Sequence, residues 1–261
     1  MNWKPAFSIA LLIGTVACQA QPSQNGAENS AKPAEAAAEA VTLKASDGVA
    51  VHGLYYQAQN PRALILLFHQ AGSSKDEYAT IAPQLVKAGF SAMAIDQRSG
   101  GGLFGANETA AGLGKKADYL EARPDLKAAL DWARTKSLPI VLWGSSYSSS
   151  LIFPLAASDP QGIVALLAFS PGEYFDDTSM IRTAAAKVNV PVFVASANSK
   201  DETGEADPIM AALPKSDGNV RFVPAHGVHG SSMLVASRNP SGAQENMRAV
   251  LAFLDRVAPK R

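Results

Sequence analysis

Residues 141–148, with the sequence VLWGSSYS, join an apolar run to a group of small hydroxyl residues. Beyond them, apolar residues recur at the three-to-four-residue spacing of a helix. A strand, a tight turn and a helix with a serine at the turn form the layout of a nucleophile elbow, G-x-S-x-G. Such a serine could attack a carbonyl carbon once a neighbouring base removes its proton. The alternative is a Ser-rich helix N-terminus that caps itself.

The steric demands of this turn select one serine from the group. The turn presses together the residues two before and two after the nucleophile, so both must be small. Around Ser146 these positions hold Gly144 and Ser148, whereas Ser145 has two aromatic residues there. We therefore expect Ser146 to be the nucleophile, with Ser148 in place of the last glycine of the motif.

The segments around this serine alternate in pattern, which determines where other polar side chains can lie. Two short strands are expected at 41–43 and 49–56. Buried strands and helices then alternate: strands at 63–68, 90–95, 140–143, 163–169, 191–195 and 220–223, and helices at 78–86, 119–135, 178–187, 208–213 and 243–257. The alternation predicts an α/β domain with a mainly parallel sheet, and the first two strands can form an antiparallel edge.

Ligands bind beyond the carboxyl ends of the strands in such sheets, so the polar residues that follow each buried strand are candidates. In chain order these residues are His69, Gln70, Asp96, Ser146, Ser170, Glu173, Asn198, Asp201, His226 and His229. The order serine, acid, histidine emerges, which resembles the triad order of the α/β-hydrolase superfamily. The resemblance covers roughly residues 41–257 and is closest to the lidless, dienelactone-hydrolase-like branch of esterases. It implies helices on both faces of the sheet and a minimal cap or none, because only about 20 residues separate the strands at 163–169 and 191–195.

The resemblance implies that His229 takes the proton of Ser146, since a serine hydroxyl is a poor nucleophile without a base. His229 lies in a loop that ends in His-Gly, as in the family, while His226 is a rival nearer the strand. Asp201 resembles the family's acid, which holds the imidazole in one tautomer and stabilises the imidazolium. Competing acids follow the same strand or the preceding one: Glu202, Glu205, Glu173, Asp176 and Asp177.

The tetrahedral intermediate of acyl transfer needs two N–H donors for its oxyanion. One is expected from Tyr147, directly after the nucleophile and at a helix N-terminus. The family commonly reads His-Gly-x after its first buried strand, with x donating, and this maps the second donor to Ala71. Gln70 replaces the glycine, so the choice between Gln70 and Ala71 stays open. His69 is expected to bond the backbone of this loop.

Composition argues against several other classes of function. The 261 residues, 47% of them hydrophobic, are enough for one large domain, and the formal net charge of zero gives no electrostatic case for nucleic-acid binding. The single cysteine permits neither an intrachain disulfide nor a Cys-based zinc site. His226 and His229 have no third ligand nearby, and no phosphate-binding glycine motif follows a strand. We expect no metal and no organic cofactor.

The first 17 residues are typical of a secretory signal, with Lys4 before an apolar segment too short to span a bilayer comfortably. Thr15-Val16-Ala17 before Cys18 resembles a bacterial lipobox, with Thr15 where leucine is usual. The resemblance implies cleavage before Cys18 and lipid on its thiol and new amine. An ordinary signal peptide, cut near residue 17 or 20, is the alternative and would leave a periplasmic or secreted protein.

Residues 18–40 are polar and alanine-rich, and we expect a flexible linker there, which leaves residues 41–261 as the hydrolase domain. The sequence therefore predicts a serine hydrolase, most simply a carboxylic-ester hydrolase that forms an acyl-enzyme with a small-molecule ester. Lipid would anchor it to a bacterial envelope membrane, most simply the periplasmic side of the outer membrane. An acyltransferase or peptidase with the same triad, or a non-catalytic binding protein of the same fold, are the alternatives. The acyl and alcohol groups and the oligomeric state stay open.

Overall fold

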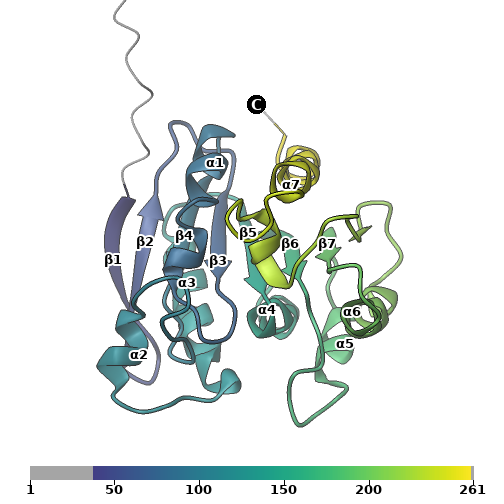
Figure 1. Ribbon diagram of the computed structural model, residues 1–261. Coiled ribbons are helices and arrows are strands. Elements are labelled where there is room, and N and C mark those ends of the chain that lie inside the picture. The colour runs from purple at the N-terminus through teal and green to yellow at the C-terminus, as the bar shows by residue number, and fades with distance from the viewer. Residues whose placement is uncertain (1–37, 260–261) are drawn as a thin grey trace, which may run out of the picture. The chain divides into compact units, whose positions relative to one another are not determined.

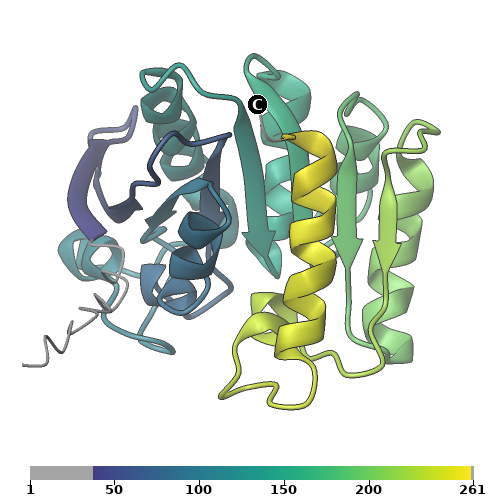
Figure 2. The same ribbon diagram turned by 90° about the horizontal axis from the view of Figure 1, so that it is seen from above.

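The computed structural model describes residues 38–259, so the expected signal peptide, Cys18 and most of the expected linker lie outside the described residues. Residues 38–259 form an eight-stranded sheet in the order β1-β2-β4-β3-β5-β6-β7-β8, with helices on both faces (Figures 1 and 2). The predicted fold class, an α/β-hydrolase fold with a mainly parallel sheet, is confirmed. Within the described residues, no helix is both long and apolar enough to cross a membrane.

The strands are β1 (Ala38–Lys44), β2 (Ala50–Tyr56), β3 (Leu64–Phe68), β4 (Ser91–Ile95), β5 (Ile140–Ser145), β6 (Ile163–Phe169), β7 (Val192–Ala195) and β8 (Val220–Phe222). The helices are α1 (Ala82–Lys87), α2 (Glu108–Leu113), α3 (Arg123–Arg134), α4 (Tyr147–Ser158), α5 (Met180–Ala185), α6 (Lys200–Ala212) and α7 (Ala243–Val257). Three 3₁₀ helices complete the set: η1 (Lys75–Tyr78), η2 (Tyr119–Ala122) and η3 (Gly230–Leu234). β2 pairs antiparallel with β1 and β4, and the remaining neighbours in the sheet pair parallel.

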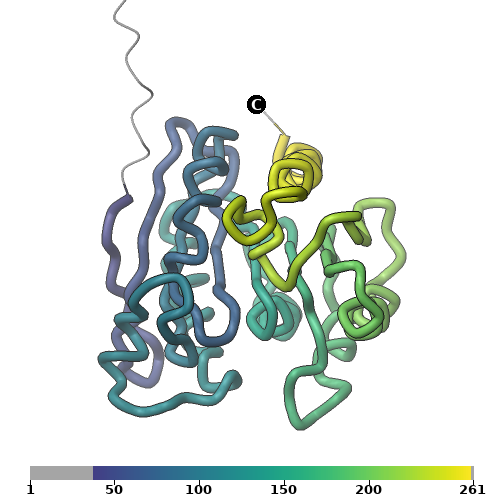
Figure 3. The backbone as a smooth tube through the Cα atoms, in the orientation of Figure 1, coloured from purple at the N-terminus to yellow at the C-terminus, as the bar shows by residue number. Residues whose placement is uncertain are grey.

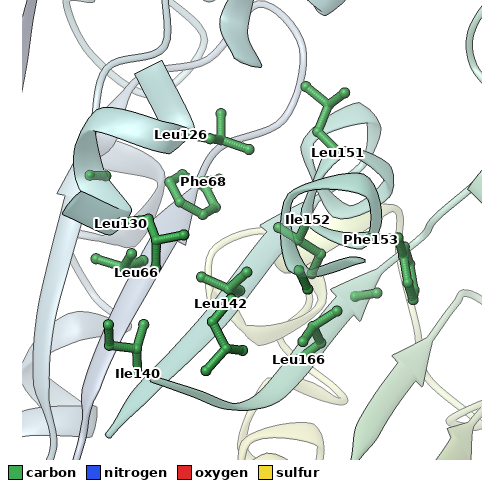
Figure 4. Packing of buried hydrophobic residues seen from close by; sticks show 14 of the residues in the cluster. Leu66, Phe68, Leu126, Leu130, Ile140, Leu142, Leu151, Ile152, Phe153 and Leu166 are labelled. Carbon is green, nitrogen blue, oxygen red and sulfur yellow. The ribbon is translucent and has the colours of Figure 1, made fainter. Parts of the chain in front are cut away.

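The central strands are buried on both faces, which explains their unalternating apolar sequences. In β3, Leu64, Leu66 and Phe68 pack into the core under α3, α4, α5 and α6, whereas Ile65 and Leu67 pack into the core under α1 and α7. Figure 4 shows the first of these cores, with side chains of β3 and β5 beside those of α3 and α4. Each core fixes one layer of helices, so the strand ends between them are held rigidly.

The order of the strands reverses at β3, which lies between β4 and β5. β3 and β5 pair in parallel with Phe68 opposite Gly144, so both strands end at the same edge of the sheet. Ligand sites in open α/β sheets form at such a reversal. The chain therefore brings His69, directly after β3, close to Ser146, directly after β5.

Two boundaries differ from the sequence-based expectation near the first edge of the sheet. β1 begins at Ala38, not at residue 41, because residues 38–40 continue the ladder to Leu54–Tyr56 of β2. The glycine-rich segment 96–114, between the strand expected at 90–95 and the helix expected at 119–135, contains α2. Asn107 caps this helix by accepting the Ala110 N–H at 2.7 Å, and Gly114 ends it at a φ of 69°.

The largest difference concerns α6, which was expected to begin at Pro208 but begins at Lys200. Ser199 caps it by accepting the Glu202 N–H at 3.3 Å. Pro208 lies inside the helix, where it removes one backbone hydrogen bond without ending the helix. Residues 200–205 therefore lie on helical turns and not in a loop. The connection from β6 to β7 contains α5 as its only helix, so no cap covers this edge (Figure 3).

Candidate active site

Ser146 occupies a sharp turn between β5 and α4. Its backbone angles are φ 59° and ψ −130°, a conformation that is rare and strained for a residue with a side chain. The Ser146 N–H donates to the carbonyl of Phe169 at 2.8 Å, which ties the turn to the end of β6. The residue is 8% exposed. These angles are those expected of a nucleophile elbow.

Small residues flank Ser146 because the turn leaves no room for larger ones. A Cβ on Gly144 would lie 2.4 Å from the backbone of Ser149, so only glycine fits at this position. Ser148, which replaces the motif's last glycine, is tolerated because its hydroxyl finds partners. It donates to the Phe68 carbonyl at 2.7 Å and accepts the Ser145 N–H at 2.9 Å. The substitution thus links the end of β3 to the elbow.

His229 lies against the serine hydroxyl, with 2.8 Å between His229 Nε2 and Ser146 Oγ. On the other side of the ring, a carboxylate oxygen of Glu202 accepts the proton of Nδ1. With Nδ1 protonated, Nε2 is free to accept the serine proton. The His229 side chain is 44% exposed and that of Glu202 is 17% exposed, so this half of the site is open to water. The three side chains form one continuous hydrogen-bonded chain.

Backbone contacts hold the histidine loop in place. The N–H of Gly230 donates to Ser170 Oγ at 2.9 Å, and the N–H of Ser231 donates to Ser145 Oγ at 2.8 Å. The indole N–H of Trp143 donates to Ser231 Oγ at 2.9 Å. Trp143 and Ser145 both belong to β5, so the strand that carries the nucleophile also positions the base.

Asp201, the acid expected from the sequence, does not pair with His229. It is exposed, while Glu202, one residue later, carries the carboxylate at the ring. Successive residues of a helix point about 100° apart, so once α6 begins at Lys200 only one of the two can face the histidine. Ser199 and Glu202 have the S-x-x-E spacing of a capping box, which places a glutamate side chain back toward the helix start. That spacing was the signal that could have identified Glu202.

The electrostatics of Glu202 fit an ionised partner for the histidine. Burial works to raise the pKa of its carboxyl group, but hydrogen bonds from His229 and Ser170 outweigh burial, and the pKa lies below its ordinary value. Among the other acids weighed from the sequence, Glu205 accepts the N–H of Glu173 at 3.3 Å. Glu173 accepts the N–H groups of residues 181 and 182 at 2.8 and 2.9 Å, and Asp177 accepts that of residue 179 at 2.9 Å.

The loop after β3 can offer one backbone N–H to an oxyanion. The hydrogen bonds of the loop show whether this N–H belongs to Gln70 or to Ala71. The N–H of Gln70 already donates to Glu77 Oε2 at 2.9 Å. This excludes Gln70 and leaves Ala71 as the candidate donor. Tyr147 supplies the second candidate, because it is the first residue of α4 and its N–H has no acceptor within the helix.

His69 fixes the peptide group that contains the Ala71 N–H. The Gln97 N–H donates to His69 Nε2 at 2.9 Å, so Nδ1 carries the ring proton and donates it to the Gln70 carbonyl at 2.8 Å. Burial lowers the pKa of His69 to about 4, so the ring stays neutral at neutral pH. The C=O and N–H of a trans peptide point in opposite directions, so the Ala71 N–H points away from His69. His69 thus has the structural role expected for it.

A family model described as serine aminopeptidase, S33, matches residues 59–202, which is more than half of the chain. The chain belongs to this family. The match begins before β3 and ends at Glu202, so it includes the loop after β3 and the turn at Ser146 but not His229. A comparison with curated protein sequences finds no significant match.

Solved structures with the same fold are numerous. A dienelactone hydrolase from Anabaena variabilis has a TM-score of 0.68 at 16% identity, covering 86% of this chain and 99% of its own. A thermostable carboxyl esterase from Bacillus coagulans has a TM-score of 0.65 at 13% identity, covering 85% and 99%. A Pyrococcus furiosus esterase has a TM-score of 0.63 at 16% identity, covering 85% and 91%. At these identities the likeness establishes the fold of this S33-family chain.

Further side chains complete the surroundings of the elbow in this S33-family protein. The Tyr147 hydroxyl accepts from Gln97 Nε2 at 2.8 Å and lies 2.7 Å from Ser99 Oγ. Its ring stacks on Tyr119 with centroids 4.4 Å apart. Tyr174 donates its hydroxyl to the Ser170 carbonyl at 2.8 Å, and burial raises its pKa well above the ordinary value. These contacts fix the Tyr147 and Tyr174 side chains.

His226, the rival base, is exposed, and its backbone carbonyl accepts the side-chain amides of Asn239 and Asn246 at 2.9 Å. It lies on the same loop as His229 but serves to hold the loop to α7. Within residues 38–259, no group of three His, Cys, Asp or Glu side chains is arranged to hold a metal ion.

Proposed function

We propose that this protein is a serine hydrolase that cleaves carboxylic esters through an acyl-enzyme formed on Ser146. The observation that carries the proposal is the hydrogen-bonded chain from Ser146 to His229 to Glu202, with the serine held at a strained turn. Serine, imidazole and carboxylate in this arrangement make a hydroxyl group nucleophilic at neutral pH.

In the proposed reaction, Ser146 Oγ attacks the carbonyl carbon of the ester while its proton moves to His229 Nε2. The carbonyl oxygen becomes an oxyanion that accepts the N–H groups of Ala71 and Tyr147. Glu202 stabilises the imidazolium of His229. The intermediate collapses as His229 protonates the leaving alkoxide. Water then attacks the acyl-enzyme, gives its proton to His229 and releases the acid, and the proton returns to Ser146.

Two features favour an ester with accessible ends as the substrate. The connection between β6 and β7 adds only α5, so no segment within residues 38–259 forms a lid that would enclose a long chain. A hollow lined in part by Gly72, Ser99 and Tyr119 adjoins the loop after β3, and we propose that it receives one half of the substrate. The dienelactone hydrolase and the esterases of the same fold add support for ester chemistry.

Turnover of a chain-length series of p-nitrophenyl esters tests the proposal. We expect hydrolysis by the unmodified enzyme and a fall of at least about 10⁴-fold in kcat for Ser146→Ala. The matched control is Ser158→Ala, at the exposed end of α4, which should retain kcat. Turnover that survives in Ser146→Ala would contradict the assignment of the nucleophile.

Amide cleavage is the second candidate, because the family is described as serine aminopeptidase. The same triad can serve amides, so amino-acid p-nitroanilides should be assayed beside the esters. A kcat/KM for the anilides above that for every ester would replace the esterase assignment. Absence of turnover on both classes, together with no labelling by a fluorophosphonate, would indicate a binding protein of the same fold.

We also infer that Cys18 is lipidated after cleavage of residues 1–17, which would anchor the enzyme to a bacterial envelope membrane. The support is the lipobox-like Thr15-Val16-Ala17 before the chain's single cysteine, followed by a polar segment. Mass spectrometry of the membrane fraction should find a mature N-terminus at Cys18 carrying acyl chains, and Cys18→Ser should release the protein. A mature chain that begins beyond Cys18 would contradict this inference.

A further inference from the structure

Glu77 is a buried acid that the proposed reaction does not use. It lies in η1 and is 1% exposed. Its Oε2 accepts the Gln70 N–H at 2.9 Å. Among the residues that the structure describes, no group hydrogen-bonds its Oε1, and the buried hydroxyl of Ser73 nearby has no partner either. Burying a carboxyl group lowers the stability of the fold unless hydrogen bonds compensate. Within residues 38–259, Glu77 has only one such bond, to a backbone N–H, which points to a functional role.

The surroundings of Glu77 belong to three parts of the active site. Burial raises the pKa of its carboxyl group to about 7, opposed by the Gln70 N–H and by the nearby hydroxyls of Ser145 and Ser73, which lie outside hydrogen-bonding geometry. The titratable groups that face it are His229, whose charge favours the ionised carboxylate, and Tyr78, whose hydroxyl donates to the Phe68 carbonyl at 2.6 Å. Glu77 binds the loop after β3, and that loop meets the elbow and the histidine loop, because a Cβ on Gly230 would lie 2.5 Å from Ser145 Oγ and 3.7 Å from Gln70 Oε1.

Gln70 is held on both of its backbone sides. Its carbonyl accepts the His69 Nδ1 proton at 2.8 Å, and its N–H donates to Glu77. These two contacts restrict both peptide groups that flank the residue, and the second of these groups carries the Ala71 N–H. A glutamine at this position has less backbone freedom than a glycine would have. Here the glutamine side chain adds one more contact, from Nε2 to Ser232 Oγ at 3.3 Å.

We propose that Glu77 is a positioning residue for the oxyanion hole: its carboxyl group accepts the Gln70 N–H and so aims the Ala71 N–H at the substrate oxygen. The inference rests on the proposed function, because it concerns the transition state of that reaction. Preorganised donors account for much of the rate in acyl transfer, and small misplacements of a donor lower it steeply.

The proposed role requires that Glu77 place an acceptor oxygen at the right distance from the Gln70 N–H. It does not require that the carboxyl group be charged. A protonated carboxyl group still has a carbonyl oxygen that accepts an N–H, and so has an amide. Glu77→Gln keeps that acceptor, and its new amide can donate to the Ser73 hydroxyl. Glu77→Asp keeps the charge but shortens the side chain by one methylene. Glu77→Leu keeps the bulk and removes the acceptor.

The experiment measures kcat and KM for a p-nitrophenyl ester, with kcat normalised to the active sites titrated by a fluorophosphonate. We expect Glu77→Leu and Glu77→Asp to lower kcat about 10- to 100-fold with KM changed less than about 3-fold, since an oxyanion donor acts in the transition state. Glu77→Gln should keep kcat within about 3-fold. The split between kcat and KM, and the rescue by glutamine, distinguish positioning from general destabilisation.

Leu85→Ala is the matched control, because Leu85 is a fully buried apolar residue of α1 that belongs to the core under α1 and α7 and offers no hydrogen-bonding group. It should lower stability and leave the normalised kcat unchanged. If Glu77→Leu does not fold, the comparison of Glu77→Asp with Glu77→Gln still tests whether Glu77 positions the oxyanion donor. An unmodified enzyme without ester turnover would contradict the proposed function itself.

Given an active enzyme, three results would overturn the role of Glu77. The first is a kcat unchanged in both Glu77→Leu and Glu77→Asp. The second is a kcat in Glu77→Gln as low as in Glu77→Asp, which would mean that charge or general fit is what matters. The third is a rise in KM with kcat retained, which would place Glu77 in substrate binding.

Discussion

The two sides of Ser146 are built in contrasting ways. On the oxyanion side, His69 and Gln97 are 0% exposed and Glu77 is 1% exposed, and the loop backbone is bonded at several points. On the base side, the His229 side chain is 44% exposed, and its carboxylate partner stands at the start of a surface helix. One side is enclosed by the sheet and its loops, and the other faces water.

This contrast follows from what each side must do. Dipoles that stabilise an oxyanion act most strongly where water is excluded and where they need not reorient during the reaction. The base must instead exchange protons with a departing alcohol and an arriving water, so it needs access to solvent. We expect substitutions on the base side to change activity with little effect on folding. Substitutions on the buried side should change stability as well.

The largest expected effect is on the base. His229→Ala should lower kcat by at least about 10⁴-fold, because a triad without its base loses nearly all of its activation of serine. The measurement is steady-state ester hydrolysis, with thermal unfolding as the check on folding.

His226→Ala is the control, since its ring is exposed on the same loop and only its backbone carbonyl is used. It should keep kcat within about 3-fold. The reverse pattern, with His226→Ala inactive and His229→Ala active, would overturn the assignment of the base.

The next effect tests the acid. Glu202→Gln should lower kcat about 10²- to 10⁴-fold, since the amide cannot stabilise an imidazolium, while KM changes little. Asp201→Asn, one residue earlier and exposed, should be nearly silent. The kinetics of the two variants decide which residue is the acid beside His229. A large loss of kcat in Asp201→Asn alone would favour Asp201, the residue expected from the sequence.

The third effect concerns the packing of the elbow. Gly144→Ala should destabilise the protein by about 3 kcal/mol, because overpacking a well-packed site costs roughly 1–3 kcal/mol and this Cβ would lie 2.4 Å from the Ser149 backbone. Urea denaturation measures the change. Gly112→Ala in α2, where nothing lies within 4 Å of a new Cβ, should instead gain up to about 1 kcal/mol. Equal effects at the two glycines would contradict the steric account of the elbow.

The last effect, similar in size but spread over several pH units, is a pH dependence of stability on the buried side. Glu77 has an ordinary pKa of 4.5 and a pKa of about 7 in the fold, because burial disfavours its charge. Between these values the folded state holds a proton that the unfolded state releases, so the contribution of Glu77 to stability falls as pH rises through this range. A tenfold change in proton affinity is about 1.4 kcal/mol, so the fall amounts to about 3 kcal/mol.

Chemical denaturation of the unmodified protein and of Glu77→Gln at several pH values isolates the contribution of Glu77 to the free energy of unfolding. The difference in unfolding free energy should shift in favour of Glu77→Gln by about 3 kcal/mol from pH 4.5 to pH 8. A pH-independent difference would show that Glu77 titrates near its ordinary value in the fold.

The sequence predicted the fold and part of the site for physical reasons that differ between the two sides. Buried apolar runs marked the strands, and the rule that ligands bind beyond their carboxyl ends brought Ser146 and His229 together. The elbow could be predicted from the sequence because its steric requirement is local. Position 144 must be glycine because of residues only a few positions away in the chain. The same holds for the loop of His69, whose backbone contact is with the next residue.

The features that could not be predicted from the sequence depend on contacts between distant segments or on which way a residue of a helix points. Asp201 was chosen because it resembles the family's acid. That choice failed because the cap at Ser199 starts α6 at Lys200, eight residues before the expected start, and the helix then turns Glu202 toward His229. Glu77 carried no sequence signal, since its partner at Gln70 is reached only when η1 folds back on the loop after β3. The choice between Gln70 and Ala71 likewise needed that contact.

Labelling with a fluorophosphonate, followed by mass spectrometry of the intact protein and of its peptides, tests the central claim most directly. The account predicts one adduct per chain on Ser146, formed with second-order kinetics that slow strongly in His229→Ala and moderately in Glu202→Gln. An adduct on another serine, or none on a folded protein, would contradict it.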